Sequence, residues 1–305
     1  MNNTRQNSLG FSPFLKWPGG KRWLWQRYSK FFAVEYERYI EPFLGGAAIF
    51  FAIHPRKAVL ADLNPHLVNT YRTLEADWRA VWTKLQEHHR RHSELQDYYY
   101  SARASKPRSE AGLAAKFIYL NRTCFNGIYR VNLKGEFNVP KGTKNSVIFP
   151  DDDFREIASR LKNAKLLVAD FEEIIDRAGR GDFLFIDPPY TVKHNNNGFI
   201  KYNERIFSWQ DQERLAKALR RLRGRGGKAL VTNAAHQSVV DLYGELGEVH
   251  VLDRCSTLSS DVSKRMTVEE IAVTVGYSVK SEIAGAKNTA MGAQDGGARR
   301  YLTLP

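Results

Sequence analysis

The chain has 305 residues, which is enough for one large domain or two moderate ones. Hydrophobic residues at 43% and aromatic residues at 12% indicate a globular body and exclude a disordered chain. The 46 Lys and Arg residues outnumber the 33 Asp and Glu residues. The resulting net charge of +13 favours a polyanionic partner over simple solubility.

Cysteine usage and hydropathy exclude further classes of protein. Cys124 and Cys255 lack CxxC spacing, so the sequence predicts neither a disulfide framework nor a metal site. The polar N-terminus has no apolar signal-peptide core, and no run of about 18 apolar residues predicts a membrane span. These features predict a cytoplasmic protein without membrane association and without an evident obligate protein partner.

Short apolar segments alternate with helical periodicity along the chain, as at the expected helices 47–51 and 211–222. Strands alternating with helices predict an α/β fold with a doubly wound, mostly parallel sheet. The expected strands are residues 38–40, 57–61, 164–169, 183–186, 228–232 and 267–275.

A stretch in the first half of the chain breaks this alternation. Helical periodicity continues through 70–95 and 113–121, and a Gly-rich basic loop follows at 125–144. We therefore predict that residues 63–145 are a helical insertion in an α/β domain formed by residues 1–62 and 146–277. Residues 278–305 are poor in apolar periodicity and are predicted to be a disordered tail.

The residues Asp187-Pro188-Pro189-Tyr190 follow directly on the apolar strand 183–186. Ligands of parallel sheets bind outside the carboxyl ends of the strands. The two prolines stiffen the segment and remove two backbone donors, which leaves free carbonyls. A carboxylate, a carbonyl and an aromatic ring at one strand end suit a flat substrate that carries an amino group. A proline-rich turn that only ends a core strand is the alternative.

A second candidate site lies at the first two strands. Gly45-Gly46 opens a helix after the first strand, Glu41 stands at the end of that strand, and Asp62 ends the next one, seventeen positions after Gly45. This is close to the spacing of roughly 20 residues at which an acidic side chain binds ribose hydroxyls. Because the pattern is not GxGxxG, a nucleoside such as S-adenosylmethionine fits better than a dinucleotide. A tight turn followed by a helix N-cap is the alternative.

Six spaced motifs occur in an order that resembles the Dam-type DNA adenine-N6 methyltransferases, the alpha-arrangement or D12 class. They are FLKWPGGK at 14–21, EPFLGG at 41–46, YLNR with FNG at 119–127, GEFNVP at 135–140, DF at 170–171 and DPPY at 187–190. The resemblance runs from Phe14 to about Tyr277. Pro18 stands where Ala is frequent, and Gly45-Gly46 replaces a more usual Gly-Ala-Gly; neither change removes a functional group.

The resemblance implies a Rossmann-like methyltransferase sheet with a helical target-recognition insertion and S-adenosylmethionine as cofactor. It implies that Asp62 binds the ribose, that Asp170 and Phe171 bind the adenine ring of the cofactor, and that the DPPY residues hold the target base. The implied cofactor site comprises Trp17, Lys21, Glu41, Pro42, Phe43, Gly45, Asp62, Asp170 and Phe171.

The basic loop and its surroundings are predicted to bind double-stranded DNA. Basic residues meet phosphates, arginine reads guanine edges, and aromatic rings can wedge between bases. The resemblance implies that Phe125 and Asn126 fill the space left by a flipped base. It also implies that Lys16, Ile128, Arg130 and Pro140 contact a GATC sequence. The predicted DNA-binding residues are Lys16, Arg122, Phe125, Asn126, Ile128, Arg130, Lys134 and Pro140. A solvated basic loop is the alternative.

Together these features predict methyl transfer to the N6 amino group of a flipped adenine. Methylation of RNA or of protein glutamine, and a nucleic-acid-binding relative without catalysis, are the rival hypotheses. His88 and His92 have the i, i+4 spacing of metal ligands but are expected to lie on an exposed basic helix face. The neighbouring residues 98–100, all tyrosine, are expected to pack the insertion.

Overall fold

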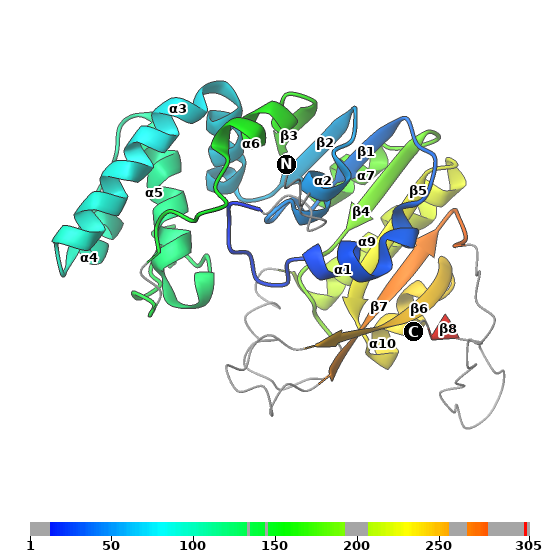
Figure 1. The fold of residues 1–305 in the computed structure, drawn as a ribbon. Coiled ribbons are helices and arrows are strands. Elements are labelled where there is room, and N and C mark those ends of the chain that lie inside the picture. Colours follow the sequence, from blue (N-terminus) through cyan, green and yellow to red (C-terminus); the bar gives the residue numbers. More distant parts are fainter. Residues whose placement is uncertain are drawn as a thin grey trace, which may run out of the picture. The chain divides into compact units, whose positions relative to one another are not determined.

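The computed structural model describes residues 13–132, 135–143, 146–192, 207–255, 267–279 and 302–303. These residues form two compact units. Unit 1 combines the chain up to Tyr28 with Leu44–Ala169, and unit 2 combines Ser29–Phe43 with the chain from Asp170 onward. Figure 1 shows the elements of each unit coloured along the sequence.

Unit 1 contains a pair of parallel strands with helices packed around it. Strand β2 (Ala58–Asp62) pairs with β3 (Ala164–Val168) in parallel register. The short helices are α1 (Arg22–Tyr28), α2 (Ala48–Ile53) and α6 (Phe154–Leu161). A parallel pair needs a long crossover between its strands, and here the crossover includes the whole helical stretch between Asp62 and Ala164.

Helix α3 (Pro65–Glu94) is the longest element of unit 1. It begins at the N-cap Asn64, whose side chain accepts hydrogen bonds from the next backbone N–H groups, and it is interrupted at Asp77, where φ is −148° and ψ is 75°. Helix α5 (Glu110–Thr123) runs beside it, α4 (Tyr98–Ala104) lies near its far end, and the 3-10 turn η2 (Phe125–Gly127) follows (Figure 1).

Unit 2 is built on the strands β1 (Arg38–Glu41), β4 (Asp182–Ile186), β5 (Lys228–Ala234), β7 (Thr267–Val275), β6 (Gly247–Cys255) and β8 (Leu302–Thr303), in this spatial order. Strands β1, β4 and β5 are parallel, whereas β7 is antiparallel to both of its neighbours. All five residues of β4 are buried, as expected for a central parallel strand.

Helices cover this sheet and complete unit 2. They are η1 (Ser29–Phe32), α7 (Phe171–Asp176), α9 (Trp209–Gly224) and α10 (Gln237–Tyr243). Helix α9 packs on β5 and α7, and α10 packs on β6 (Figure 1). Within the described residues, no helix has both the length and the apolar character that crossing a membrane requires.

The six predicted strands and the α/β class are confirmed, with boundaries shifted by one or two residues. Strand β6 was not among the predicted strands, and β8 falls within the tail that was predicted to be disordered. Most of that tail lies outside the described residues. The predicted insertion belongs to the same compact unit as β2, β3 and α6, because α3 packs against all three.

Candidate active site and nucleic-acid interface

Asp187 stands at the end of the buried strand β4, as the sequence predicts. Its Oδ1 accepts a hydrogen bond of 2.7 Å from the hydroxyl of Thr232, which lies near the end of β5. Pro188 is buried, and Pro189 and Tyr190 are partly exposed. The four predicted acceptor residues therefore leave the sheet together, with the carboxylate fixed by a neighbouring strand.

Tyr190 is tied to the same sheet through its hydroxyl, which donates a 2.7 Å hydrogen bond to Oε2 of Glu270 on β7. Glu270 is only 2% exposed. Burial and the negative charges of Asp187 and Glu270 raise the pKa of Tyr190 well above its ordinary value, so the hydroxyl keeps its proton. Neither Thr232 nor Glu270 was among the predicted site residues.

The chain beyond Tyr190 is anchored at both of its described ends. The hydroxyl of Thr191 donates to the carbonyl oxygen of Phe207 at 2.6 Å. The ring of Phe207 then packs on two rings predicted to bind cofactor, with centroids 5.6 Å from Phe43 and 5.5 Å from Phe171. Phe43 and Phe171 are stacked on each other at 5.3 Å and 22°. Three aromatic rings thus form one cluster in unit 2.

Glu41 lies beside this cluster in the sequence, at the end of β1, followed by the buried Pro42. Its carboxylate is 2% exposed and accepts a 2.5 Å hydrogen bond from the hydroxyl of Tyr39. Burial and the nearby Glu41 carboxylate raise the pKa of Tyr39 well above its ordinary value. The strand-end carboxylate therefore has a fixed orientation.

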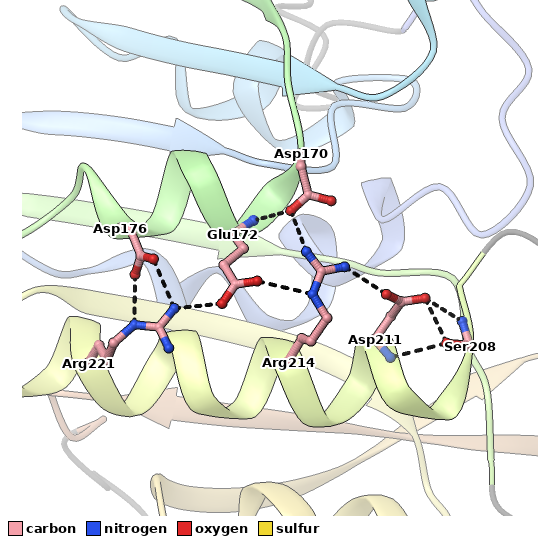
Figure 2. A network of polar contacts seen from close by, with 7 residues as sticks. All are labelled: Asp170, Glu172, Asp176, Ser208, Asp211, Arg214 and Arg221. Carbon is pink, nitrogen blue, oxygen red and sulfur yellow. Dashed lines mark hydrogen bonds and ion pairs between the residues drawn. The ribbon is translucent and has the colours of Figure 1, made fainter.

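Asp170 is the N-cap of α7 and the start of a polar network that joins α7 to α9 (Figure 2). Its Oδ1 accepts from the backbone N–H of Glu172 and from Nη2 of Arg214, both at 2.9 Å. The guanidinium of Arg214 also binds Glu172 and Asp211, and its carbon lies 4.8 Å from the centre of the Phe171 ring. Arg214 therefore fixes both predicted adenine-binding residues, Asp170 and Phe171.

In unit 1, the two glycines at the start of α2 are required by Trp17. Gly45 has a φ of +45°, which favours glycine, and a Cβ there would lie 2.8 Å from Cδ1 of the Trp17 ring. A Cβ on Gly46 would lie 3.1 Å from Cβ of Trp17. Trp17 therefore lies directly against the backbone at which the sequence predicts that a ligand binds.

Asp62 organises the same turn through both of its carboxylate oxygens. Oδ2 accepts from the backbone N–H of Gly45 at 3.1 Å, and Oδ1 accepts from that of Asn64 at 3.0 Å. Burial raises the pKa of Asp62, and the backbone hydrogen bonds oppose this shift. Asp62 is not a helix N-cap, because Asn64 has that role. Lys21 is buried and donates from Nζ to the carbonyl of Gly19 at 2.7 Å.

The predicted DNA-binding loop is an irregular hairpin that continues α5. Isolated bridges pair Cys124 with Lys141 and Val131 with Phe137, in antiparallel orientation. At its base, Phe125 is 50% exposed, although its backbone N–H is bonded to the carbonyl of Pro140. Asn126 has a φ of +55°, a conformation that costs energy for a residue with a side chain. An exposed ring on a strained turn is a common feature of functional sites.

Other predicted contact residues gather around this turn. Lys16 and Asn121 exchange two hydrogen bonds through the Lys16 backbone, and Nζ of Lys16 donates to the carbonyl of Arg122. Arg130 is exposed on the hairpin and donates from Nε to Oδ1 of Asn138 at 2.9 Å. The structure thus brings one set of predicted residues to the hairpin and its base: Lys16, Phe125, Asn126, Ile128, Arg130 and Pro140. Lys134 lies outside the described residues.

The prediction that Arg122 contacts DNA is wrong. Its side chain has 0% exposure and forms a bidentate ion pair with Asp152, which is 4% exposed. The guanidinium also donates to the backbone carbonyls of Phe14 and Val147. All of its donors point into unit 1, so this arginine joins the N-terminal segment to the helical region and cannot reach a phosphate.

The expectation of an exposed histidine face on α3 is also wrong. The ring of His88 stacks on Tyr119 at 4.8 Å and 12°, and burial lowers its pKa to about 4. Nδ1 of His92 lies 2.8 Å from the hydroxyl of the same tyrosine. Tyr99 is fully buried, in agreement with the prediction, whereas Tyr100 is 46% exposed. Within the described residues, no group of three His, Cys, Asp or Glu could hold a metal ion.

In unit 2, Glu41 and Asp187 lie at the ends of parallel strands, the position at which α/β proteins bind their ligands. The comparison with protein families identifies the class of protein. The family model of the D12 class N6 adenine-specific DNA methyltransferases matches residues 17–257, and the chain belongs to this family. The predicted family resemblance and the methyltransferase fold class are confirmed.

Similar proteins cover most of the chain. The type II methyltransferase M1.LlaDCHI of Lactococcus lactis subsp. cremoris is 34% identical over 90% of this chain and 99% of its own length. The type II methyltransferase M.MjaIII of Methanocaldococcus jannaschii is 34% identical over 77% of this chain and 88% of its own. A DNA adenine methylase of Haemophilus influenzae is 30% identical over 88% of this chain and 95% of its own.

Proposed function

We propose that this enzyme transfers a methyl group from S-adenosylmethionine to the N6 amino group of an adenine that is flipped out of double-stranded DNA. The observation that carries the proposal is the fixed carboxylate of Asp187 at the end of β4, followed by Pro188 and the anchored ring of Tyr190. An acceptor pair and a flat ring at one strand end match an aminopurine.

The chain offers groups that fit S-adenosylmethionine, a nucleoside with a cationic sulfonium. The carboxylates of Asp62 and Glu41 suit ribose hydroxyls and positive charge, and the stacked rings of Phe43 and Phe171 suit a purine. In the part of the chain that the structure describes, Oδ2 of Asp170 has no hydrogen-bond partner, so it can accept an amino hydrogen. We assign cofactor binding to these residues with Trp17, Lys21, Pro42 and Gly45.

The chemistry follows from the acceptors that surround the target amino group. S-Adenosylmethionine, when bound, supplies an electrophilic methyl group. If Asp187 and the Pro188 carbonyl accept the two N–H bonds, the nitrogen lone pair turns out of the ring plane and becomes available. As the bond from the nitrogen to the methyl carbon forms and the sulfur–methyl bond breaks, the sulfonium would become a neutral thioether and positive charge would develop on the nitrogen, where Asp187 stabilises it. One amino proton would then pass along its hydrogen bond to the Asp187 carboxylate. Holding the reactants in line lowers the barrier further.

The target base has to leave the duplex to reach this site, because its amino group is buried in the base stack. The ring of Tyr190 would stack on the flipped base. Exposed Phe125 and the strained Asn126 next to it would fill the vacated space, as a wedge residue does. We propose that Lys16, Ile128, Arg130 and Pro140 read the sequence GATC.

One experiment separates this proposal from its rivals. The enzyme is incubated with S-adenosylmethionine labelled in the methyl group and with duplex DNA, RNA or a protein mixture, and the labelled product is digested to identify the base. We expect N6-methyladenine in duplex DNA alone. Label in RNA or in protein glutamine, or no transfer to any of them, would overturn the proposal.

The role of Asp187 is tested by Asp187→Ala with Asp241→Ala, an exposed residue on α10, as the matched control. We expect Asp187→Ala to abolish transfer while S-adenosylmethionine binding by calorimetry stays close to that of the wild type. Methylated plasmid is also digested with endonucleases that distinguish methylated from unmethylated GATC. Complete cleavage by the methylation-blocked endonuclease would exclude GATC as the target.

A further inference from the structure

We propose that Thr232 and Glu270 are positioning residues of the methyl-transfer site: Thr232 orients the Asp187 carboxylate and Glu270 orients the Tyr190 ring. This inference rests on the proposed function and extends it to two strands that lie beyond the DPPY segment. The contacts that carry it are the 2.7 Å hydrogen bonds from Thr232 to Asp187 and from Tyr190 to Glu270.

The sheet register explains why these four residues meet. Ile186 is paired with Val231, so Asp187, one residue later, is level with Thr232 on the same face of the sheet. In the pair of β5 with β7, Ala234 is opposite Glu270. Ala234 is two residues after Thr232, so Thr232 and Glu270 point to the same face of the sheet. The antiparallel strand β7 therefore carries a carboxylate to the carboxyl ends of parallel strands.

Thr232 is suited to hold a carboxylate because it is itself immobile. Its side chain is 0% exposed, and a β-branched residue in a strand has few allowed rotamers. A hydroxyl that donates to an ionised carboxylate forms a stronger hydrogen bond than one between neutral groups. This bond helps to fix the orientation of the Asp187 carboxylate, the group that would accept a hydrogen bond from the amino group of the base.

Glu270 acts on the second group of the site. Because it accepts the hydrogen bond of the Tyr190 hydroxyl from within the sheet, it limits rotation of the tyrosine ring about the chain. A ring held in one plane presents a prepared stacking face, so that less conformational freedom is lost when the base arrives. Thr232 and Glu270 thus prepare one acceptor and one stacking surface on the same side of the sheet.

The test of Thr232 uses two substitutions and a matched control. Thr232→Val removes the hydroxyl at nearly constant shape, and Thr232→Ser restores it. Thr274→Val is the control, because Thr274 is a buried threonine of the same sheet whose hydroxyl has no hydrogen-bond partner in the described part of the chain. All three variants are first compared with the wild type by thermal unfolding.

We expect Thr232→Val to lower kcat between about tenfold and about a hundredfold, the cost of a misplaced reacting group. The KM for S-adenosylmethionine should change by less than about threefold, since the substitution removes no cofactor contact. Thr232→Ser should recover most of kcat, and Thr274→Val should retain it. Equal kcat for Thr232→Val and the wild type, or no recovery with serine, would overturn the role of Thr232.

Glu270 is tested by comparing Glu270→Gln, which keeps an acceptor oxygen, with Glu270→Met, which has similar length and none. The probe is duplex DNA carrying 2-aminopurine at the target position, since 2-aminopurine fluorescence rises when the base leaves the stack. We expect Glu270→Gln to resemble the wild type and Glu270→Met to bind the flipped base less tightly. Identical fluorescence titrations for the two variants would remove Glu270 from the site.

Failure of the inference and failure of the proposed function give different results. A wild-type enzyme that does not methylate adenine in duplex DNA contradicts the function itself. An active wild type whose Thr232→Val and Glu270→Met variants are equally active contradicts only the positioning roles.

Discussion

At the scale of single residues, the candidate site contains carboxylates whose orientation is set by hydrogen bonds from neighbouring residues. Asp187 is held by the hydroxyl of Thr232, Glu41 by that of Tyr39, and Asp62 by two backbone N–H groups. A carboxylate that keeps one orientation costs less conformational entropy when a ligand binds. Close contacts also determine the conformation of the glycine turn at Gly45 and of the buried Arg122 side chain in unit 1.

Gly45 tests the contact between the glycine turn and Trp17. In Gly45→Ala the Cβ would approach the Trp17 ring to 2.8 Å at a φ of +45°, so both strain and steric overlap oppose the change. We expect a loss of about 1–3 kcal/mol in the free energy of unfolding, and weaker S-adenosylmethionine binding by calorimetry.

The control for Gly45 is Gly135→Ala, because Gly135 has a φ of +75° but nothing within 4 Å of its Cβ position. It isolates the cost of the backbone conformation from that of the contact. An equal loss of stability in both variants would show that the Trp17 contact contributes nothing.

Substitution of Arg122 tests whether this buried side chain stabilises the fold through its ion pair with Asp152. Arg122→Ala leaves Asp152 buried without its partner, and breaking such a pair costs about 3–5 kcal/mol of unfolding free energy. Arg91→Ala, which removes an ion pair on a side chain 46% exposed, should cost less than about 1 kcal/mol. Urea unfolding measures both. A stable Arg122→Ala protein with weakened DNA binding would support the original prediction instead.

At the scale of elements, each unit contains contacts that hold neighbouring segments together. In unit 1, α5 leads into the hairpin whose bridges pair Cys124 with Lys141 and Val131 with Phe137. In unit 2, α9 is bound to α7 by the guanidinium groups of Arg214 and Arg221 (Figure 2). Arg214 and Arg221 of α9 are therefore engaged in contacts within unit 2.

The exposed position of Arg130 on the hairpin leads to a prediction about how the enzyme discriminates between DNA sequences. Arg130 is exposed and, among the described residues, bonds through Nε to Asn138, so the rest of the guanidinium can bind a guanine edge. We expect Arg130→Ala to reduce discrimination at one base pair by about 1–3 kcal/mol, measured as kcat/KM on cognate and single-substitution duplexes. Arg56→Ala, an exposed arginine outside the hairpin, should leave the ratio unchanged. Unchanged ratios for both variants would exclude base reading by Arg130.

Local patterns predicted the fold and the strand-end residues well. Asp187 follows an apolar strand directly and Asp62 is the last residue of one, so the sequence next to each predicts its position. Thr232 and Glu270 could not be found in this way, since their contact with the site depends on strand register and on the reversed direction of β7. Strands β5 and β7 carry several polar residues, and no local pattern distinguishes Thr232 and Glu270 from the others.

Long-range contacts also explain the wrong predictions. Arg122 looked like a phosphate-binding residue because it precedes the basic loop 125–144. Its partner Asp152, however, is thirty positions away, and the Phe14 carbonyl is more than a hundred positions away. His88 looked exposed beside charged residues, whereas Tyr119 from another helix covers it. Burial of a polar side chain is a property of the packed structure rather than of its sequence neighbourhood.

At the scale of the whole molecule, buried histidines make stability depend on pH. Burial lowers the pKa of His88 to about 4, below its ordinary value of about 6.5. His88 is therefore neutral in the folded state. The stability that its neutral ring contributes to the fold is fully present above pH 6.5 and is lost as the pH falls toward 4. We expect a loss of about 1–2 kcal/mol across this window, reduced because the ring is only partly buried.

Urea unfolding at pH 7 and pH 4.5 measures this dependence in the wild type and in His88→Gln. The free energy of unfolding should fall less in His88→Gln than in the wild type. Part of the decrease should remain in the variant, because burial also lowers the pKa of His250. Equal decreases in the two proteins would show that His88 does not titrate on unfolding.

The hydrogen bond between Thr191 and Phe207 has a consequence for how the sequence can change. It closes a stretch of chain whose two ends are already fixed, one in the acceptor segment and one in the aromatic cluster. The entropy of closing a loop grows only with the logarithm of its length. A change in the number of residues between Thr191 and Phe207 should therefore alter the closure entropy only slightly, while the hydrogen bond and the ring contact at the two anchors stay the same.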